Sequence, residues 1–302
     1  MANTLGGINL AQIAEEALDY LSYDFFPLSA VATDFSTDIA TRGESVTTRI
    51  ASALTAQDLS SGYSSAAQDV TSTAVTVTLS NFFGVPYGFT DLEISKAGDS
   101  EWLKNQFIAP ALEGLKDKIM NTIFTICTTA NYANETISTA ANFDSDDLAD
   151  IAGALTALKV PMRNRSMIVD PTYYTALMKD AVVEDASAFG DNQAIREGVV
   201  QRVRGVNVFQ YANIPDLSEN FEGMVLHPSA IAFAARTVAD PTDLNADAPV
   251  QVENVVDPVT GLPLQFRAWY DANAGKWYLS VASLWGVAKG QGNSMHRIVS
   301  AA

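Results

Sequence analysis

The feature that most constrains this chain is a long row of apolar residues at alternate positions. Between residues 75 and 89, every odd position is apolar except Asn81. Side chains that alternate in this way share one face of a β-strand, which rises by about 3.3 Å per residue. A continuous strand of this length would span about 50 Å, whereas most strands have about 3–10 residues. The row therefore predicts a strand that projects from its own domain, with Gly84 and Pro86 marking a bend or an edge position near its base.

A second alternating segment precedes this row and is its predicted pairing partner. Residues 46–50 have the pattern of a half-buried strand. The segment between the strands, residues 52–73, is rich in Ser, Thr, Ala and Gly and contains only two charges, Asp58 and Asp69. We interpret the whole as a protruding two-stranded hairpin, and because an isolated hairpin is marginally stable in water, we expect it to lie on another molecule. The alternative is a flexible surface loop.

The first 43 residues form a distinct segment. Leu10, Ile13 and Leu21 recur at helical spacing, and the aromatic pair Phe25 and Phe26 follows them. Such a segment could cap its own domain or reach a neighbouring subunit as an arm, and the residues leave both possibilities open. No basic region followed by an apolar stretch is present here, so we expect no secretory signal.

The rest of the chain predicts an α+β protein. Residues 99–130 have the pattern of one long helix, about 45 Å long if it continues to residue 128, with a kink or restart at Pro110. Residues 144–236 alternate between short helices and strands, including a short helix at 229–235, and predict a compact α/β domain. Residues 264–287 predict a β-hairpin that turns at 271–275 and packs under the long helix.

Composition limits the possible functions. The chain has 302 residues, enough for two domains, with 48% hydrophobic and 18% charged residues, and no apolar run of membrane-spanning length. Its net charge of −17 argues against direct nucleic-acid binding, which needs a basic surface to neutralise phosphates. The acidity suits a protein that is soluble at high local concentration, or one that lines a container for a polyanion without binding it. It also suits an ordinary acidic protein.

Residues that would indicate catalysis or metal binding are sparse. The single cysteine, Cys127, lies among apolar residues and predicts a buried structural thiol. The two histidines, His227 and His296, have no second ligand at metal spacing, and the HExxH, GxSxG and GxxxxGK[ST] motifs are absent. The glycines around Lys289 do not have the spacing of a phosphate loop. We therefore expect no enzyme activity, cofactor or metal.

Several short motifs occur in an order that resembles one protein family. They are Arg165–Leu177 (RSMIVDPTYYTAL), Phe189-Gly190, IREG at 195–198, VRGVNV at 203–208 and HPSAI at 227–231. Together with the order of predicted parts, they resemble the major capsid proteins of tailed bacteriophages with the Hong Kong 97-type fold. The resemblance covers nearly the whole chain, and each motif is weak by itself.

This resemblance implies a domain organisation and a function. Residues 1–43 would be an N-terminal arm, 44–95 an extended loop, 96–142 and 237–302 a peripheral domain with a spine helix and β-strands, and 143–236 an axial domain. The chain would be a virion protein that is assembled in the host cytoplasm. It would form the pentamers and hexamers of an icosahedral head that encloses double-stranded DNA without sequence-specific binding, and a portal would be one of its partners.

The sequence departs from parts of this family's pattern. Some members join their subunits through lysine–asparagine bonds from the extended loop, but no lysine precedes Lys96 here. We therefore expect non-covalent contacts or a separate cement (decoration) protein to stabilise the shell. The arm is also too short for a built-in scaffolding region, so we expect a separate scaffolding protein.

Seven residues are our candidates for contacts between subunits. Phe25 and Phe26 are the leading arm anchors, because aromatic residues dominate buried interfaces. Arg42 and Arg49 are the only positive charges before Lys96, and we expect them to pair with carboxylates of a neighbour, although solvated surface arginines are the alternative. The remaining candidates, all in the hairpin segment, are Asp58, Tyr63 and Asp69.

Three other functions compete with a phage capsid subunit. An encapsulin-like shell protein of a cellular compartment would have the same fold class. An acidic surface-layer or adhesin-like protein would suit the Thr- and Ser-rich hairpin, but the lack of a signal sequence argues against it. An enzyme with an unrecognised site is the third, and a ligand-dependent rise in melting temperature would reveal it.

Overall fold

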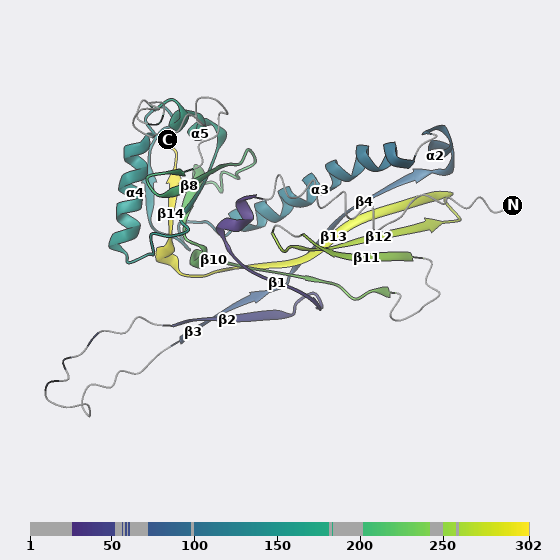
Figure 1. Cartoon of the computed structure of the whole chain (residues 1–302), viewed down its shortest axis with the longest axis horizontal. Helices are drawn as coiled ribbons and strands as arrows, with labels where there is room; N and C mark the ends of the chain where they lie inside the picture. Colours follow the sequence, from purple (N-terminus) through teal and green to yellow (C-terminus); the bar gives the residue numbers. More distant parts are fainter. Residues whose placement is uncertain are drawn as a thin grey trace.

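The part of the chain that the structure describes folds into two six-stranded sheets and a separate two-stranded ribbon, with few helices. In Figure 1 one sheet, the long sheet, extends along the molecule beside helix α3, and the other, the compact sheet, lies at one end with helices α4 and α5. The computed structural model describes residues 26–51, 56, 58, 60, 72–97, 100–180, 183, 202–241, 250–257 and 260–301. The predicted helix at residues 10–21 lies outside these residues.

The long sheet is built around one long strand, β13 (Lys276–Lys289), which carries Trp277 and Trp285. Its strand order is β1-β10-β13-β12-β11, and β4 pairs antiparallel with β13 on the side opposite β10, because Leu284 and Trp285 of β13 pair with both strands. The predicted turn at residues 271–275 joins β12 to β13, which confirms the C-terminal hairpin. The other strands of this sheet are β1 (Ala32–Ile39), β4 (Asn81–Thr90), β10 (Ile231–Thr237), β11 (Val250–Val256) and β12 (Pro263–Asp271).

Helix α3 (Ser100–Phe124) covers one face of the long sheet, as predicted, and the short helix α2 (Asp91–Ala97) precedes it (Figure 1). Leu115 and Ile119 of α3 share a core with Phe233 and Trp285 of the sheet. Burying each such side chain contributes about 1.5–3 kcal/mol, so this layer is the main core of the molecule. The 3-10 helix η1 (Phe26–Ala30) reaches the same core through Leu28.

The long helix is continuous through its proline and ends earlier than predicted. It continues through Pro110, which lies on the exposed side, and no second helix begins there. It ends at Phe124 rather than near residue 128, which makes it about 37 Å long at 1.5 Å per residue. Ile123 and Phe124 are both buried at the C-terminal end of the helix, where 3.6 residues per turn place them toward the core.

The alternating row at 75–89 forms two strands and not one. In the ribbon, β2 (Ser45–Ala51) pairs with β3 (Ser72–Thr78). After β3 the chain continues through Leu79 and enters the long sheet as β4. Val77 in β3 and Leu79 just after it pack against Ala234 and Leu284, whereas Val85 in β4 packs into the core under α3. The predicted continuous strand is therefore wrong, although the alternation is present in both parts.

The compact sheet has the order β5-β14-β9-β6-β8-β7, with α4 and α5 packed on it. Asp144 caps α4 by accepting from the backbone N–H groups of Asp146 and Asp147, and Asp170 caps α5 just before Pro171. We call this sheet with its two helices the compact unit. Its elements are α4 (Ser145–Ala157), α5 (Pro171–Met178), β5 (Glu135–Ile137), β6 (Ser166–Val169), β7 (Arg202–Val203), β8 (Val206–Gln210), β9 (Phe221–Leu226) and β14 (Met295–Val299).

Two chain crossings join the compact unit to the long sheet at places that the sequence did not indicate. The predicted helix at 229–235 is wrong: a single 3-10 turn, η2 (Pro228–Ala230), leads directly into strand β10 of the long sheet. The chain returns through η3 (Gly292–Ser294) into β14, which lies in the compact sheet. The sequence-based boundary at residues 236–237 therefore does not follow the two sheets.

Candidate assembly surfaces

The ribbon β2–β3 is the most prominent candidate surface, because it extends away from both sheets (Figure 1). Its base is anchored by Val77 and Leu79, which are buried against the long sheet. Arg42 lies at this base, exposed, and its Nε donates a 3.0 Å hydrogen bond to the carbonyl oxygen of Ser80 in the same chain. Arg49 lies on the exposed side of β2, opposite Ala74 of β3. Pairing of either arginine with a neighbouring carboxylate stays a prediction.

The other predicted contact residues are only partly described. Asp58 is exposed and accepts a 2.9 Å hydrogen bond from the backbone N–H of Ser60, which lowers the pKa of its carboxyl group. Phe25, Tyr63 and Asp69 lie outside the described residues, and Phe26 belongs to η1 but its side chain is not described. The described part of the chain therefore does not bring the seven residues together.

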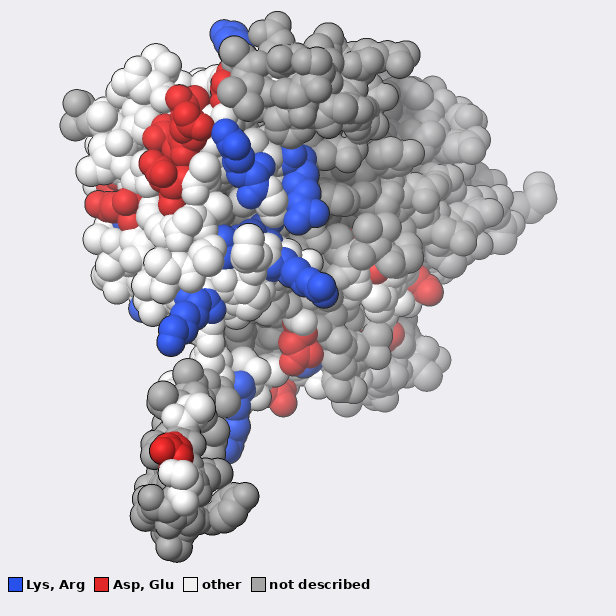
Figure 2. Space-filling model, turned by 60° about the vertical axis from the view of Figure 1, so that its left-hand side comes forward, with Lys and Arg blue, Asp and Glu red and all other residues white. Residues whose placement is uncertain are grey.

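Charge is unevenly distributed on the compact unit. Residues 138–150 contain four carboxylates and no cation, whereas residues 151–169 contain three cations and no carboxylate. Figure 2 shows acidic side chains gathered over one part of this end of the molecule, with Lys and Arg beside and below them. Arg204, from the turn between β7 and β8, pairs with Asp146 at 3.1 Å, and both side chains are exposed. The compact unit thus has separate acidic and basic regions on its exposed surface (Figure 2).

An open groove lies beside the start of α4. It has a volume of about 640 Å³ and is formed by residues 140–144 on one side and by α5 and the residues after it on the other. Small side chains such as Ala140 and Ala176 line it, together with Asp144 and Asp180. The Asp180 carboxylate also accepts a 2.8 Å hydrogen bond from the backbone N–H of Ser145, which fixes α5 against α4. The hydrogen bond between Ser145 and Asp180 therefore holds the two sides of the groove together.

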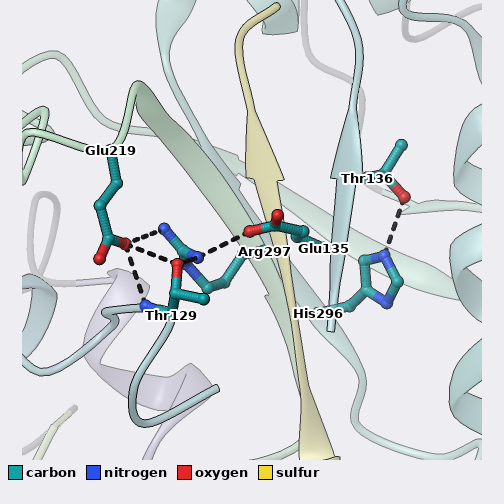
Figure 3. Close-up of polar contacts among 6 residues, drawn as sticks. All are labelled: Thr129, Glu135, Thr136, Glu219, His296 and Arg297. Carbon is teal, nitrogen blue, oxygen red and sulfur yellow. Dashed lines mark hydrogen bonds and ion pairs between the residues drawn. The ribbon is translucent and has the colours of Figure 1, made fainter. Parts of the chain in front are cut away.

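A buried arginine, Arg297 of β14, organises the inner side of the compact sheet (Figure 3). Its side chain is fully buried and bonds to Thr129 after α3, Glu135 of β5 and Glu219 before β9. The Arg297–Glu135 contact is 2.8 Å, and Glu219 also accepts from the backbone N–H of Thr129 at 3.0 Å. Arg297 thus connects three segments by hydrogen bonds and ion pairs at the junction of the two sheets. Sequence reasoning missed this hub, although a charge inside the apolar strand Met295–Val299 was a usable signal.

His296 lies beside this hub on the opposite side of β14 (Figure 3). Its Nε2 is 2.8 Å from the Thr136 hydroxyl, and its Nδ1 is buried without a hydrogen-bond partner among the described residues. Burial lowers the pKa of this imidazole, which favours its neutral form. For Glu219, the hydrogen bond from the Thr129 backbone lowers the carboxyl pKa. The hub thus places the carboxylates of Glu135 and Glu219 on either side of the Arg297 guanidinium.

Cys127 is fully buried just after α3, and burial raises the pKa of its thiol, which confirms the predicted structural thiol. Within the described ranges, no group of three or more His, Cys, Asp or Glu side chains is arranged to hold a metal ion. No described helix is both long and apolar enough to cross a membrane.

Comparison with known proteins finds similarity in structure but not in sequence. No family model matches the chain, and no curated protein matches it. A structure titled as the capsid of cyanophage P-SCSP1u matches with a TM-score of 0.61 at 13% identity, covering 90% of this chain and 86% of that one. A Mycobacterium phage Che8 structure matches with a TM-score of 0.56 at 17% identity, covering 85% and 84%. A virus-like particle from Pyrococcus furiosus matches with a TM-score of 0.53 at 11% identity, covering 95% and 98%.

These matches extend over nearly the full length of both partners, so they concern the whole architecture and not one shared motif. They also include the mature capsid of bacteriophage PhiM1 and the head of Helicobacter pylori bacteriophage KHP40. The mixed α+β arrangement of few helices and many strands agrees with them. This chain therefore has the fold of tailed-phage major capsid proteins.

Proposed function

We propose that this chain is the major capsid protein of a tailed phage, a structural and non-catalytic subunit that assembles into the pentamers and hexamers of an icosahedral head around double-stranded DNA. The observation that carries this proposal is the whole-length likeness to phage capsid and head structures. The projecting ribbon supports it, because a two-stranded ribbon with an exposed face gains stability from lying on a second copy.

The proposal extends to the finer Hong Kong 97-type layout. The long sheet with α3 would be the peripheral domain, the compact unit the axial domain, the ribbon the extended loop, and residues 1–43 an arm that contacts neighbours. A shell built in this way is held by many weak contacts that act together. The net charge of −17 suits an inner surface that encloses DNA without binding it tightly.

Further partners follow from the same proposal. We expect a separate scaffolding protein and a portal. Because the region before Lys96 offers no lysine for a covalent cross-link, either non-covalent contacts or a separate cement protein would stabilise the shell. The protein would be assembled in the host cytoplasm and would reside in the virion.

An encapsulin-like compartment shell is the second candidate, and the Pyrococcus furiosus virus-like particle is the match that favours it. The neighbouring genes distinguish the two functions. Portal and terminase genes beside this one support a phage head, whereas an adjacent enzyme gene with a cargo-loading peptide supports a compartment.

Negative-stain electron microscopy of the purified chain, alone and with the product of a candidate scaffolding gene, tests the proposal. Closed polyhedral shells, or rings of five and six subunits, are the expected result. A single small oligomer under every assembly condition would contradict it, and ligand screening by thermal shift would then be the next step.

A further inference from the structure

The two ends of helix α4 carry opposite charges. Asp144, just before α4, lines the 640 Å³ groove with Asp180 and Lys179, and Asp146 and Asp150 follow as exposed carboxylates in the first turns of the helix. After α4 the chain forms an exposed loop, residues 158–163, that contains Lys159 and Arg163. Because α4 has 13 residues, the two regions are separated by about 20 Å along its axis.

The loop 158–163 also exposes apolar side chains. Met162 is 69% exposed and Leu158 is 39% exposed, and no described residue covers them. Lys159 adopts a left-handed backbone conformation, with φ of 61°. A few hydrogen bonds hold the loop: the guanidinium of Arg165, which is buried, donates to the carbonyl oxygens of Pro161 at 2.9 Å and Val160 at 2.7 Å. These hydrogen bonds thus fix the loop in a conformation that leaves Met162 exposed, with Lys159 and Arg163 on either side of it in the sequence.

The helix dipole explains only part of this charge distribution. Carboxylates near a helix N-terminus and cations near its C-terminus are favourable, but the effect is limited to the first and last turns. Arg163 lies six residues beyond the last residue of α4, Ala157, outside that range. The dipole also gives no reason for an exposed methionine at residue 162. An intermolecular contact accounts for both features.

We propose that the loop 158–163 of one subunit lies in the groove beside the start of α4 in the next subunit. Met162 would enter the part of the groove that is lined by alanine and threonine side chains, and Lys159 and Arg163 would approach the carboxylates at its acidic side. This inference rests on the proposed function, because it names the contact by which copies of the chain join.

The position of the two surfaces determines the kind of assembly. They are different patches at opposite ends of one helix, so the contact is heterologous, and each subunit offers one projection and one groove. Heterologous contacts form closed rings when the rotation between neighbours closes, and filaments when it does not. Rings are the expected product here, with α4 of each subunit pointing toward the next.

Disulfide cross-linking tests the contact in the full-length protein. The variant that combines Met162→Cys with Thr175→Cys places one thiol on the loop and one on an exposed residue of the groove. The native Cys127 is buried, so it does not compete. Mild oxidation of assembled particles is expected to give a ladder of covalent oligomers up to six subunits on a non-reducing gel. The matched control, Met162→Cys with Gly153→Cys, places the second thiol on an exposed residue of α4 outside the groove and is expected to give no ladder.

Charge reversal gives a second, independent test. Lys159→Glu with Arg163→Glu is expected to reduce the yield of assembled particles at least tenfold while the melting temperature of the unassembled subunit stays unchanged. Adding Asp146→Lys and Asp150→Lys to the same chain is expected to restore much of the yield, because the two reversed surfaces again attract each other. The loss in the first variant should diminish at high salt.

The outcomes separate this inference from the proposed function. Particles that form normally but give no ladder, or that tolerate the reversed loop, overturn the loop-in-groove contact and leave the capsid function intact. An unmodified chain that forms neither rings nor shells overturns both. A cross-linked product that runs only as a monomer shows that the two thiols meet within one chain, which also overturns the contact.

Discussion

Gly286 in β13 lies directly against the main-chain carbonyl of Thr78 in β3, so closely that a Cβ atom at residue 286 would overlap the carbonyl oxygen. This contact brings the base of the projecting ribbon onto the central strand of the long sheet. Val77 and Leu79 flank the contact and are buried on the same side. The direction of the ribbon is therefore set by close backbone packing against the sheet as well as by its own pairing.

Replacing Gly286 with alanine should displace the base of the ribbon. Because the neighbouring atom is backbone and cannot rotate away, we expect a loss of about 2–3 kcal/mol in the free energy of unfolding, as in overpacked cores. Urea denaturation followed by circular dichroism measures it. Gly153→Ala is the control: Gly153 has no atom near its Cβ position and lies within α4, so this change should stabilise the protein by about 0.5–1 kcal/mol. Equal effects of the two changes would refute the close-packing argument.

The Arg297 hub should be important for stability. Arg297→Met leaves Glu135 and Glu219 without their cation, and breaking a buried ion pair costs about 3–5 kcal/mol. Since about a third of each carboxylate side chain is exposed and can be hydrated, we expect the lower end, about 3 kcal/mol. Arg204→Met removes an exposed pair with Asp146 and should cost less than about 1 kcal/mol. Equal losses in chemical denaturation would show that burial of the hub has no special effect.

The two histidines should make the protein less stable as the pH falls through 6.5. Burial lowers the pKa of both imidazoles below 6.5, so between the folded pKa and 6.5 the unfolded chain binds more protons than the folded one. Their contribution to stability is therefore complete above pH 6.5 and is lost below it. Protonation of His227 would also remove the hydrogen bond that its Nδ1 accepts from the Ser229 backbone.

The pH effect can be measured as the difference in unfolding free energy between pH 7.5 and pH 5.5. We expect a larger drop in the natural chain than in the variant His227→Asn with His296→Gln, in which only carboxylates titrate over this range. These are the only two histidines in the chain, so the comparison isolates their effect. Identical pH profiles would contradict the assigned burial effect.

Cys127 should be inert in the folded protein. It is fully buried and its pKa is raised, so the nucleophilic thiolate is scarce and inaccessible. A thiol reagent such as Ellman's reagent is expected to label no thiol in the native state and one thiol per chain in denaturant. Rapid labelling of the native protein would show that the core under α3 opens easily.

Local signals in the sequence predicted most individual elements. The caps of α4 and α5, Asp144 and Asp170, each lie next to the helix that they begin, so capping is a local property of the sequence. The prediction of a short helix at 229–235 was wrong for the same reason. The alanines in this segment favour a helix locally, but in the folded protein it forms a strand that pairs with β13. Among the predicted contact residues, nothing local indicated that Arg42 would bond at the base of its own ribbon.

The sequence by itself determined which residues share a face, because the periods of strands and helices are local properties. Only the tertiary structure decided which part of the protein each row of apolar residues packs against. The single alternating pattern is therefore divided between β3, on one side of the long sheet, and β4, which contributes to the core on the other side. It also brought Arg297 to Glu135, 162 positions away, and placed β14 in the compact sheet. The physical reason is that main-chain hydrogen bonds and buried charges select partners by proximity in space, and the order of residues along the chain does not encode that proximity.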